Sequence, residues 1–320
     1  MTTNEIKNIP LSVLLLAGGR GTRFWPKSQH SLPKQMLDLL GTGKSMIEET
    51  RERVKELVPK EKVFVSTGTD LEEPLSLLLG IPREQIIVEP TPKNSAPAIG
   101  LSATYLLKKH GDGVMIVLPS DHHVTPKEIF QQQILKAAEL AWERHSLICF
   151  GIPPTRPATG YGYLEIGEKL EENSCAVKRF VEKPDLETAK AYLEEGNRLW
   201  NSGMFVWRTS AILNAIETHM PKLGEGLKEF SKTIGTEKEQ TSLLKLFQDI
   251  EPLSIDYGVM EKHDNVSLIS AEFSWDDLGS WESLTNYLPK EKDNWSKTKK
   301  LISINSKNNL IDVPTKKVAL

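Results

Sequence analysis

The sequence predicts an α/β fold, with a mostly parallel mixed sheet flanked by helices and a short β-segment at the C-terminal end. Three observations carry this prediction. Short apolar runs alternate with helix-length segments through the first half of the 320 residues, a glycine-rich turn follows the first run, and polar turns follow two later ones. With 39% hydrophobic and 26% charged residues, the chain has enough apolar side chains for a large core.

The first half repeats strand and helix. Five apolar runs predict strands at 11–16, 62–66, 85–89, 114–118 and 147–151. The segments between them predict helices at 45–57, 71–79, 94–109 and 129–144. Ser45 and Glu48 form a capping box that opens the first of these helices. Helices of this length between strands imply parallel pairing, with helices on both faces of the sheet.

The second half is less regular. It predicts strands at 161–166, 177–181 and 204–207, and helices at 186–195, 211–217, 239–250 and from 281 to about 288. Residues 289–300 form a polar linker, and residues 301–320 alternate apolar and polar side chains. We expect one main domain over residues 1–288 and a linker with a short β-segment over residues 289–320. Because so short a segment buries little core, it must pack on the main domain or on a partner.

The glycine-rich turn after the first strand is the most informative feature. Gly18, Gly19 and Gly21 break the strand, and such a turn exposes successive backbone N–H groups that can cradle phosphate. Four basic residues follow, with no acidic residue between Glu5 and Asp38: Arg20, Arg23, Lys27 and Lys34. Since the formal net charge of the chain is -3, this positive charge is local, and it favours a triphosphate site. A turn whose arginines merely face solvent is the alternative interpretation.

Two other phosphate motifs fit these residues poorly. A dinucleotide-binding fingerprint needs a third glycine, and Phe24 occupies that position. The segment from Gly41 to Ser45 matches half of a P-loop, but Asp38 stands where that motif begins with glycine. Both motifs are therefore weak.

Composition excludes several classes of protein. The near-neutral charge balance gives no reason to expect a nucleic-acid surface. No run approaches the roughly 20 apolar residues of a membrane-spanning helix. The two cysteines, Cys149 and Cys175, are too few for a disulfide framework and favour reduced thiols in the cytoplasm. The histidines lack the spacing of zinc ligands.

Two aspartates follow predicted strands and are candidate metal ligands. Asp121 lies in the polar turn that ends the apolar strand at 114–118, where bound phosphates would repel it unless a cation intervened. Mg²⁺ held by one or two carboxylates together with phosphate oxygens resolves that conflict. We select Asp277, in a second polar turn, as the partner carboxylate. An ordinary helix-capping role for Asp121 is equally compatible with the residues alone.

Other polar turns suit a sugar and a nucleobase. Glu182 and Lys183 end a strand before Pro184, and Asn201 offers an amide beside Gly203. Glycine-flanked strand starts, such as the one at Gly162, leave room for a sugar ring. Three further residues precede or open the helix at 94–109 and could contact a base or ribose: Glu89, Asn94 and Ser95. Each of these turns could equally be an unremarkable surface turn.

Taken in order, these motifs resemble the bacterial mannose-1-phosphate guanylyltransferases of the sugar-nucleotidyltransferase superfamily, over residues 11 to 320. The glycine turn through Pro26, with Pro33, Lys34 and Gln35, is similar to the signature loop of that family. The resemblance implies a Rossmann-like nucleotidyltransferase fold whose catalytic domain is residues 1–288. It also implies the reaction of GTP with mannose 1-phosphate to give GDP-mannose and pyrophosphate, assisted by Mg²⁺.

The resemblance also implies roles for the candidate residues. Arg23 and Lys34 would hold the triphosphate and Lys183 the sugar phosphate, while Asp121 and Asp277 would hold Mg²⁺. The sugar hydroxyls would contact Gly162, Glu182 and Asn201. The nucleotide would contact Ala17, Gly18, Gly19, Gly21, Thr22, Glu89, Asn94 and Ser95. Asp256 lies in a family block, but no role follows for it.

Three further expectations accompany the resemblance. A homodimer is compatible with it, whereas nucleic acid and membranes are not expected partners. Isomerase activity is not expected, because the cupin domain of bifunctional relatives has no counterpart in these residues. Ala158 replaces an acid common in the family, which bears on the sugar contacts. The alternatives are another sugar phosphate or nucleotide and, in a different class, a non-catalytic sensor of nucleotide sugars.

Overall fold

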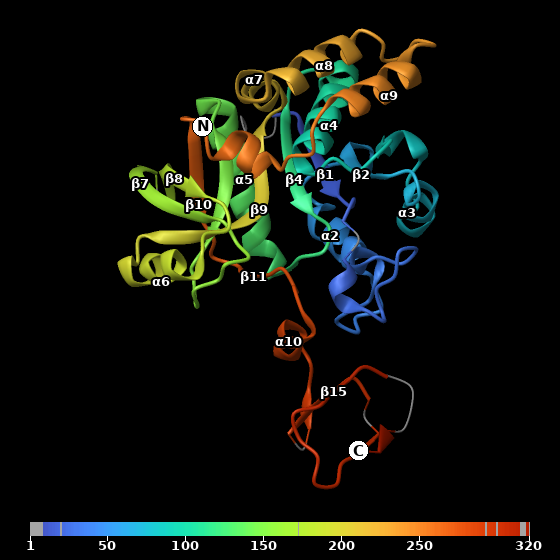
Figure 1. Ribbon diagram of the computed structural model, residues 1–320, viewed down its shortest axis with the longest axis vertical. Coiled ribbons are helices and arrows are strands. Elements are labelled where there is room, and N and C mark those ends of the chain that lie inside the picture. The colour runs from blue at the N-terminus through green and yellow to red at the C-terminus, as the bar shows by residue number, and fades with distance from the viewer. Residues whose placement is uncertain are drawn as a thin grey trace.

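The computed structural model describes residues 9–19, 21–171, 173–291, 293–298, 300–313 and 318–319, so Arg20 of the basic turn lies outside the described residues. A nine-stranded mixed sheet crosses the main body in the order β3-β2-β1-β4-β9-β6-β10-β8-β7 (Figure 1). The predicted α/β class is confirmed. In the described part of the chain, no helix is both long and apolar enough to cross a membrane.

The first half of the chain forms the parallel part of this sheet. Its strands, β1 (Leu11–Leu16), β2 (Val63–Gly68), β3 (Ile86–Glu89) and β4 (Val114–Pro119), pair in parallel. The helices between and after them are α2 (Met46–Val54), α3 (Glu72–Leu79), α4 (Ser95–His110) and α5 (Lys127–Arg144). Ser45 and Glu48 form the predicted capping box of α2. These elements agree with the predicted ones to within a few residues.

The rest of the chain completes the sheet with strands that pair mainly antiparallel. They are β6 (Leu147–Ile152), β7 (Tyr163–Glu171), β8 (Ser174–Val181), β9 (Arg198–Arg208) and β10 (Val266–Ser270). β9 pairs antiparallel with β4 and β6, while β6 and β10 are parallel. The helices are α6 (Leu186–Glu195), α7 (Thr209–His219), α8 (Pro221–Ser231) and α9 (Glu239–Asp249).

Two layers of helices cover the sheet. Val13 and Leu15 of β1 belong to the apolar core shared with α2, α3 and α5. Leu14 faces the opposite core, which includes residues of α4, α7, α8 and α9. Alternate residues of a strand face opposite sides, so a continuous apolar run such as β1 serves both cores.

Several elements differ from the sequence-based expectation. β9 begins at Arg198, so the segment around Asn201 that we expected to be a turn lies inside a strand, where the Asn201 N–H donates to the Gly162 carbonyl at 2.8 Å. The helix α8 and the strand β10 were not predicted. The helix expected from 281 to about 288 is only α10 (Trp281–Leu284), because a 3₁₀ turn at Thr285–Tyr287 replaces its second half.

The C-terminal residues form short strands that lie apart from the sheet, beyond α10 (Figure 1). They are β12 (Lys290–Glu291), β13 (Asn294–Ser296), β14 (Leu301–Ile302), β15 (Leu310–Ile311) and β16 (Val318–Ala319). Trp295 and Leu310 pack against the apolar cluster around Phe24 of the basic turn. Asp312 forms ion pairs with Lys27 of that turn and with Lys297. The segment therefore packs on the main body, as its small size requires.

Candidate active site

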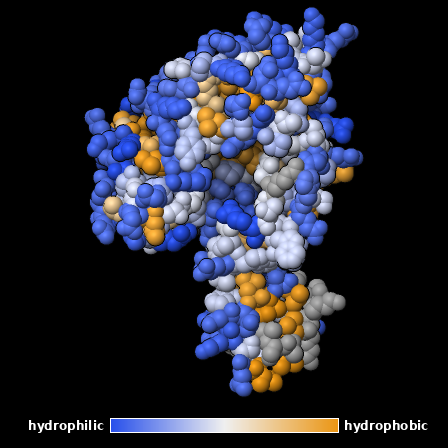
Figure 2. Space-filling view, in the orientation of Figure 1, coloured by the Kyte–Doolittle hydropathy of each residue, from blue (hydrophilic) through white to orange (hydrophobic). Residues whose placement is uncertain are grey.

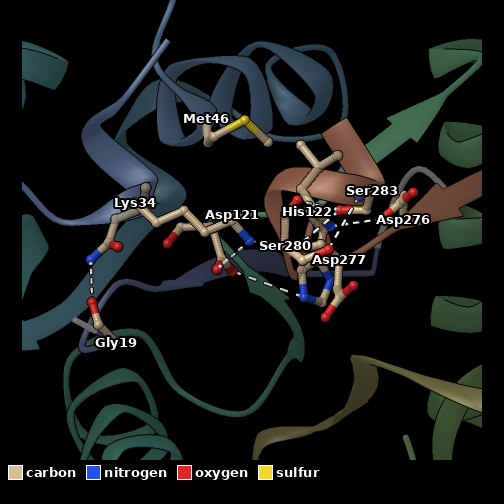
Figure 3. Close-up of polar contacts among 12 residues, drawn as sticks. Gly19, Lys34, Met46, Asp121, His122, Asp276, Asp277, Ser280 and Ser283 are labelled. Carbon is tan, nitrogen blue, oxygen red and sulfur yellow. Dashed lines mark hydrogen bonds and ion pairs between the residues drawn. The ribbon is translucent and has the colours of Figure 1, made fainter. Parts of the chain in front are cut away.

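Lys34 joins three distant parts of the chain. It opens a 3₁₀ turn (Lys34–Met36) after the basic loop, residues 18–33, which begins with the glycine-rich turn. The Lys34 side chain is only 3% exposed. Its Nζ lies 2.9 Å from Asp121 Oδ2, just beyond β4, and also donates to the backbone carbonyl of Asp277. Asp277 directly follows β11 (Ser274–Asp276), which pairs with β5 (His123–Thr125). Figure 3 shows Lys34, Asp121, His122 and Asp277 gathered at this point.

The charges at this centre are balanced. Burial by itself raises the pKa of Asp121, but Lys34, His122 and Arg23 together hold that pKa below its usual value. Burial lowers the pKa of His122 to about 4, so its imidazole is neutral near pH 7. The Nδ1 atom of His122 accepts a hydrogen bond from Trp275 Nε1 at 3.1 Å. Asp121 is thus an ionised carboxylate beside one buried ammonium group.

Asp277 and Asp276 have different environments although they are adjacent. Asp276 uses both carboxylate oxygens within the fold, accepting from the Leu278 N–H at 2.7 Å and the Tyr287 hydroxyl at 3.1 Å. Asp277 accepts from the Tyr161 hydroxyl at 2.8 Å. A Cβ on Gly279 would lie 2.9 Å from Asp277 Oδ2 and 3.0 Å from Arg23 Nη1, which places the Arg23 guanidinium next to this turn. Asp277, rather than Asp276, therefore faces the basic loop.

Gln35 fixes the glycine turn. Its buried Nε2 donates to the carbonyl groups of Ala17 and Gly19, each at 2.9 Å. Gly18 lies beside Glu89, whose carboxylate would be 3.7 Å from a Cβ on that glycine. Gly21 ends the turn in the left-handed region with φ 56°, immediately before a 3₁₀ turn at Thr22–Phe24. The carbonyls of the turn are held from inside the protein, which leaves its opposite side for a ligand.

Replacing Gly21 by alanine is expected to destabilise the protein by about 1–3 kcal/mol, because φ is positive and the new methyl group would overlap the Lys34 backbone and Cβ. Gly19→Ala is the matched control, since nothing lies within 4 Å of a Cβ at Gly19. We expect that control to change the free energy of unfolding by less than about 0.5 kcal/mol. Urea unfolding of both variants measures the difference, and equal stabilities would contradict the geometry of the turn.

The predicted base-side residues lie at the ends of β3 and α4. Glu89 is 6% exposed, accepts from the Ser66 hydroxyl at 3.2 Å, and has its pKa raised to about 7 by burial. Asn94 caps α4 through its own side chain, which accepts from the Ser95 N–H at 2.8 Å. The Ser95 hydroxyl accepts from the Ile255 N–H at 2.9 Å.

The predicted sugar-side residues meet each other. Glu182 Oε2 lies so close to Gly162 that a Cβ there would collide with it. Glu182 Oε1 pairs with Lys183 Nζ at 2.5 Å, and Glu182 N–H donates to Glu261 at 2.7 Å. Asn201 lies over the same glycine, at 3.4 Å from such a Cβ. Gly162, Glu182, Lys183 and Asn201 thus form one cluster.

Three non-glycine residues at or beside these groups have positive φ: Asn94 at 71°, Lys183 at 48° and Leu278 at 43°. Such backbone conformations are disfavoured for L-residues and concentrate at functional sites. Asn94 and Lys183 are themselves predicted site residues, and Leu278 directly follows Asp277.

A cavity of about 940 Å³ links the charged centre to the sugar side. Arg23, Tyr161, Lys183 and Asp277 line it. The lining does not include the charged-centre residues Lys34 and Asp121, the base-side residues Glu89, Asn94 and Ser95, or the sugar-side residues Gly162, Glu182 and Asn201. The surface is hollowed near the middle of the face shown in Figure 2, and mainly hydrophilic residues border the hollow.

Arg156 is a lining residue that the sequence analysis missed. Its guanidinium lies over the rings of Tyr161 and Trp200, at 5.5 and 5.6 Å from their centroids. Such stacking holds an arginine in place and leaves its N–H groups available for an anion. The signal in the sequence is that Arg156 is the one basic residue between Gly151 and Gly167, directly before the glycine-flanked strand start.

The donors at the centre fit a magnesium ion that arrives with a nucleotide. Among the described residues, no group of three or more acidic, histidine or cysteine side chains is arranged to hold a metal. The Lys34 ammonium contacts both Asp121 Oδ2 and the backbone carbonyl of Asp277, which brings these two acidic residues to the same point. Mg²⁺ commonly binds one or two carboxylates and takes its other ligands from phosphate and water, which matches this pair.

Comparison with known proteins agrees with this arrangement. A family model described as nucleotidyl transferase matches residues 12–294. A mannose-1-phosphate guanylyltransferase of Sinorhizobium fredii is 34% identical over 97% of this chain and 62% of its own length. This chain therefore spans about three-fifths of that relative.

Two solved structures are also similar. One, from Thermus thermophilus and described as a mannose-1-phosphate geranyltransferase, has a TM-score of 0.82 and 29% identity, with 95% of this chain and 90% of that chain covered. The other, from Helicobacter pylori and described as a mannose-6-phosphate isomerase, has a TM-score of 0.68 and 26% identity, with 83% and 99% covered. Since the family model spans most of the sequence and the fold agrees with it, the protein belongs to the nucleotidyl transferase family.

Proposed function

We propose that the protein transfers GMP from GTP to mannose 1-phosphate, giving GDP-mannose and pyrophosphate. The observation that carries this proposal is the meeting of the basic loop, Asp121 and Asp277 at the Lys34 ammonium. Asp277 also lines an adjoining cavity together with Arg23 and Lys183. Cations and carboxylates so arranged suit a metal-bound triphosphate facing a second phosphate. The name of the S. fredii relative supports the choice of base and sugar.

The reaction needs no nucleophilic side chain. A phosphate oxygen of the sugar phosphate attacks the α-phosphorus of GTP, and the bond from that phosphorus to the oxygen bridging the β-phosphate breaks. Pyrophosphate leaves with that oxygen and its electron pair. The protein contributes positioning and charge neutralisation. Arg23 and Lys34 would neutralise the triphosphate and the departing pyrophosphate, while Lys183 would hold the sugar phosphate.

The remaining candidate residues would orient the substrates. Asp121 and Asp277 would hold Mg²⁺, which supplies charge neutralisation at the phosphates when bound. The N–H groups of Gly18, Gly19, Gly21 and Thr22 would face the nucleotide phosphates. Ala17 would adjoin the nucleotide, while its N–H donates to the Ser66 carbonyl at 2.8 Å. Glu89, Asn94 and Ser95 would contact guanine or ribose, and Gly162, Glu182 and Asn201 would contact the mannose hydroxyls.

The decisive experiment measures pyrophosphate release over a matrix of four nucleoside triphosphates and the 1-phosphates of mannose, glucose and N-acetylglucosamine. The expected best pair is GTP with mannose 1-phosphate. A different best pair would retain the reaction and overturn the substrate assignment. No release with any pair, together with tight binding of GDP-mannose, would favour a sensor. Conversion of mannose 6-phosphate to fructose 6-phosphate is assayed in parallel, and we expect none.

Arg156→Ala is expected to raise the KM for the sugar phosphate about tenfold, because one charge-assisted contact to phosphate is lost. Arg156→Lys should recover only part of this loss, since lysine keeps the charge but not the planar stacking on Tyr161 and Trp200. Arg179→Ala, an exposed arginine on β8, is the matched control and should leave the KM unchanged. An unaltered KM in Arg156→Ala would remove this residue from the site.

We further propose that residues 1–288 form the catalytic domain, that residues 289–320 are a smaller module fixed to it, and that the enzyme works in the cytoplasm. The packing of Trp295 and Leu310 on the cluster around Phe24 supports the second point. We retain a homodimer as a proposal for solution scattering to test.

A further inference from the structure

Asp256 belongs to the sugar-side cluster, although the sequence suggested no role for it. Its Oδ1 accepts from Asn201 Nδ2 at 2.9 Å, while Asn201 Oδ1 accepts from the Gly203 N–H at 3.1 Å. Both ends of the Asn201 amide are therefore held. Because the Gly203 backbone N–H can only donate, Oδ1 of Asn201 must face Gly203 and Nδ2 must face Asp256. One N–H of Nδ2 and one lone pair of Oδ1 then stay available for a ligand.

The neighbouring Glu182 has an unused oxygen. Its side chain is 6% exposed, and Oε1 is paired with Lys183. Oε2 has no hydrogen-bond partner in the described part of the chain and lies directly over Gly162. A buried carboxylate oxygen without a partner is costly, and a ligand hydroxyl would satisfy it.

The backbone around Asp256 links the two sides of the site. Asp256 opens a short π-helix (Asp256–Met260), a form that often marks functional positions. The residue before it, Ile255, donates its N–H to Ser95 at the start of α4, and Ala96 donates to the Leu253 carbonyl. Asp256 is thus tied to the base-side helix through its backbone and to the sugar side through its carboxylate.

We propose that Asp256 is a positioning residue for the sugar phosphate: it fixes the Asn201 amide and confines the negative charge of the cluster to Glu182. This inference rests on the proposed function and adds a residue to it. In the resulting arrangement, Glu182 accepts hydroxyl hydrogens of the sugar, and Asn201 presents a fixed donor and acceptor beside it.

The charges around Asp256 favour its neutral form. Burial, followed by the charge of Glu182, raises the pKa of Asp256 to about 7, while Lys183 and Asn201 oppose the rise. Cys149 also interacts electrostatically with Asp256. Burial raises the pKa of the Cys149 thiol, so this thiol is neutral and adds no charge. A sugar phosphate bound at Lys183 adds negative charge and favours neutral Asp256 further. Since the pKa is raised, this state is present at low pH and is lost as pH rises through about 7.

The test compares Asp256→Asn and Asp256→Ala with the wild type, using whichever substrate pair the wild type uses best. Asparagine at position 256 stays neutral at every pH, whereas Asp256 of the wild type loses its neutral state as pH rises. We therefore expect the kcat/KM of Asp256→Asn for the sugar phosphate, divided by that of the wild type, to rise about tenfold from pH 6 to pH 8.5. The ratio cancels titration of the substrates. Asp256→Ala frees the Asn201 amide, and we expect kcat/KM for the sugar phosphate at pH 6 to fall about 10- to 100-fold, with the KM for the nucleotide unchanged.

Asp264→Asn, an exposed acid shortly after the π-helix, is the matched control and should follow the wild-type profile. A flat ratio for Asp256→Asn and an unaltered kcat/KM for the sugar phosphate in Asp256→Ala would overturn the role of Asp256 and leave the proposed function standing. A wild-type protein inactive with every pair would overturn the proposed function and this inference with it.

Discussion

Replacing Lys34 by alanine is expected to lower the rate of pyrophosphate release at least about 1,000-fold while the protein remains folded. The Lys34 ammonium is the buried cation shared by Asp121 and the Asp277 carbonyl. Without it, the basic loop loses its link to both carboxylate turns, and the leaving pyrophosphate loses a fixed positive charge. The measurement is pyrophosphate release at saturating GTP and mannose 1-phosphate, with circular dichroism to verify the fold.

Lys44→Ala is the control for this variant. Lys44 lies in the neighbouring segment that matches half of a P-loop and is 51% exposed, and its ammonium forms a distant ion pair with Glu52 at 3.9 Å. Exposed pairs of this kind contribute little to stability, so neither turnover nor stability should change. Loss of turnover in Lys44→Ala but not in Lys34→Ala would instead assign the phosphate to the P-loop-like segment. Comparable turnover in both variants would remove Lys34 from the mechanism.

The parts of this site that depend on local sequence could be predicted. A run of apolar residues ended by glycine predicts β1 and its turn, and a fully apolar run ended by a polar residue predicts β4 and Asp121. Both strands are parallel and adjacent, so their carboxyl ends meet at one edge of the sheet. The glycine turn and Asp121 therefore lie at the same edge for reasons that the sequence contains, whereas the contact of Lys34 with Asp121 depends on how the loop after the turn folds back.

The rest depends on long-range packing. Asp277 is 243 residues from Lys34 and follows β11, which belongs to a two-stranded ribbon outside the central sheet, so no rule of sheet topology places it. The full length of β9 depends on pairing with β4, β6 and β7. α8 has apolar residues at helical spacing, Leu223, Leu227 and Phe230, but its two glycines weaken the local signal. The contact of Asp256 with Asn201 likewise joins residues 55 apart.

Asp277→Asn is expected to impair the Mg²⁺-dependent rate and Asp276→Asn to impair stability, so the adjacent pair is a sharp test of the proposed metal site. Asp277→Asn keeps the shape of the side chain and can still accept from Tyr161, but it removes the negative charge that a magnesium ion needs. We expect kcat to fall about 100- to 1,000-fold, and the Mg²⁺ concentration for half-maximal rate to rise about tenfold, with the melting temperature little changed. The measurement is a titration of rate against Mg²⁺.

Asp276→Asn should lower the stability and leave the Mg²⁺ dependence of the rate unchanged, because the Asp276 carboxylate already accepts from the Leu278 N–H and the Tyr287 hydroxyl. An asparagine can keep its oxygen toward the Leu278 N–H and donate its amide N–H to the Tyr287 hydroxyl oxygen, but both hydrogen bonds then lack a charged partner. We expect a cost of about 1–2 kcal/mol, which lowers the melting temperature by roughly 2–4 °C. Its Mg²⁺ titration should match the wild type. If Asp276→Asn shifts the Mg²⁺ titration and Asp277→Asn does not, the metal-binding carboxylate is Asp276. Mg²⁺ titrations that match the wild type in both variants would place the ion away from this turn altogether.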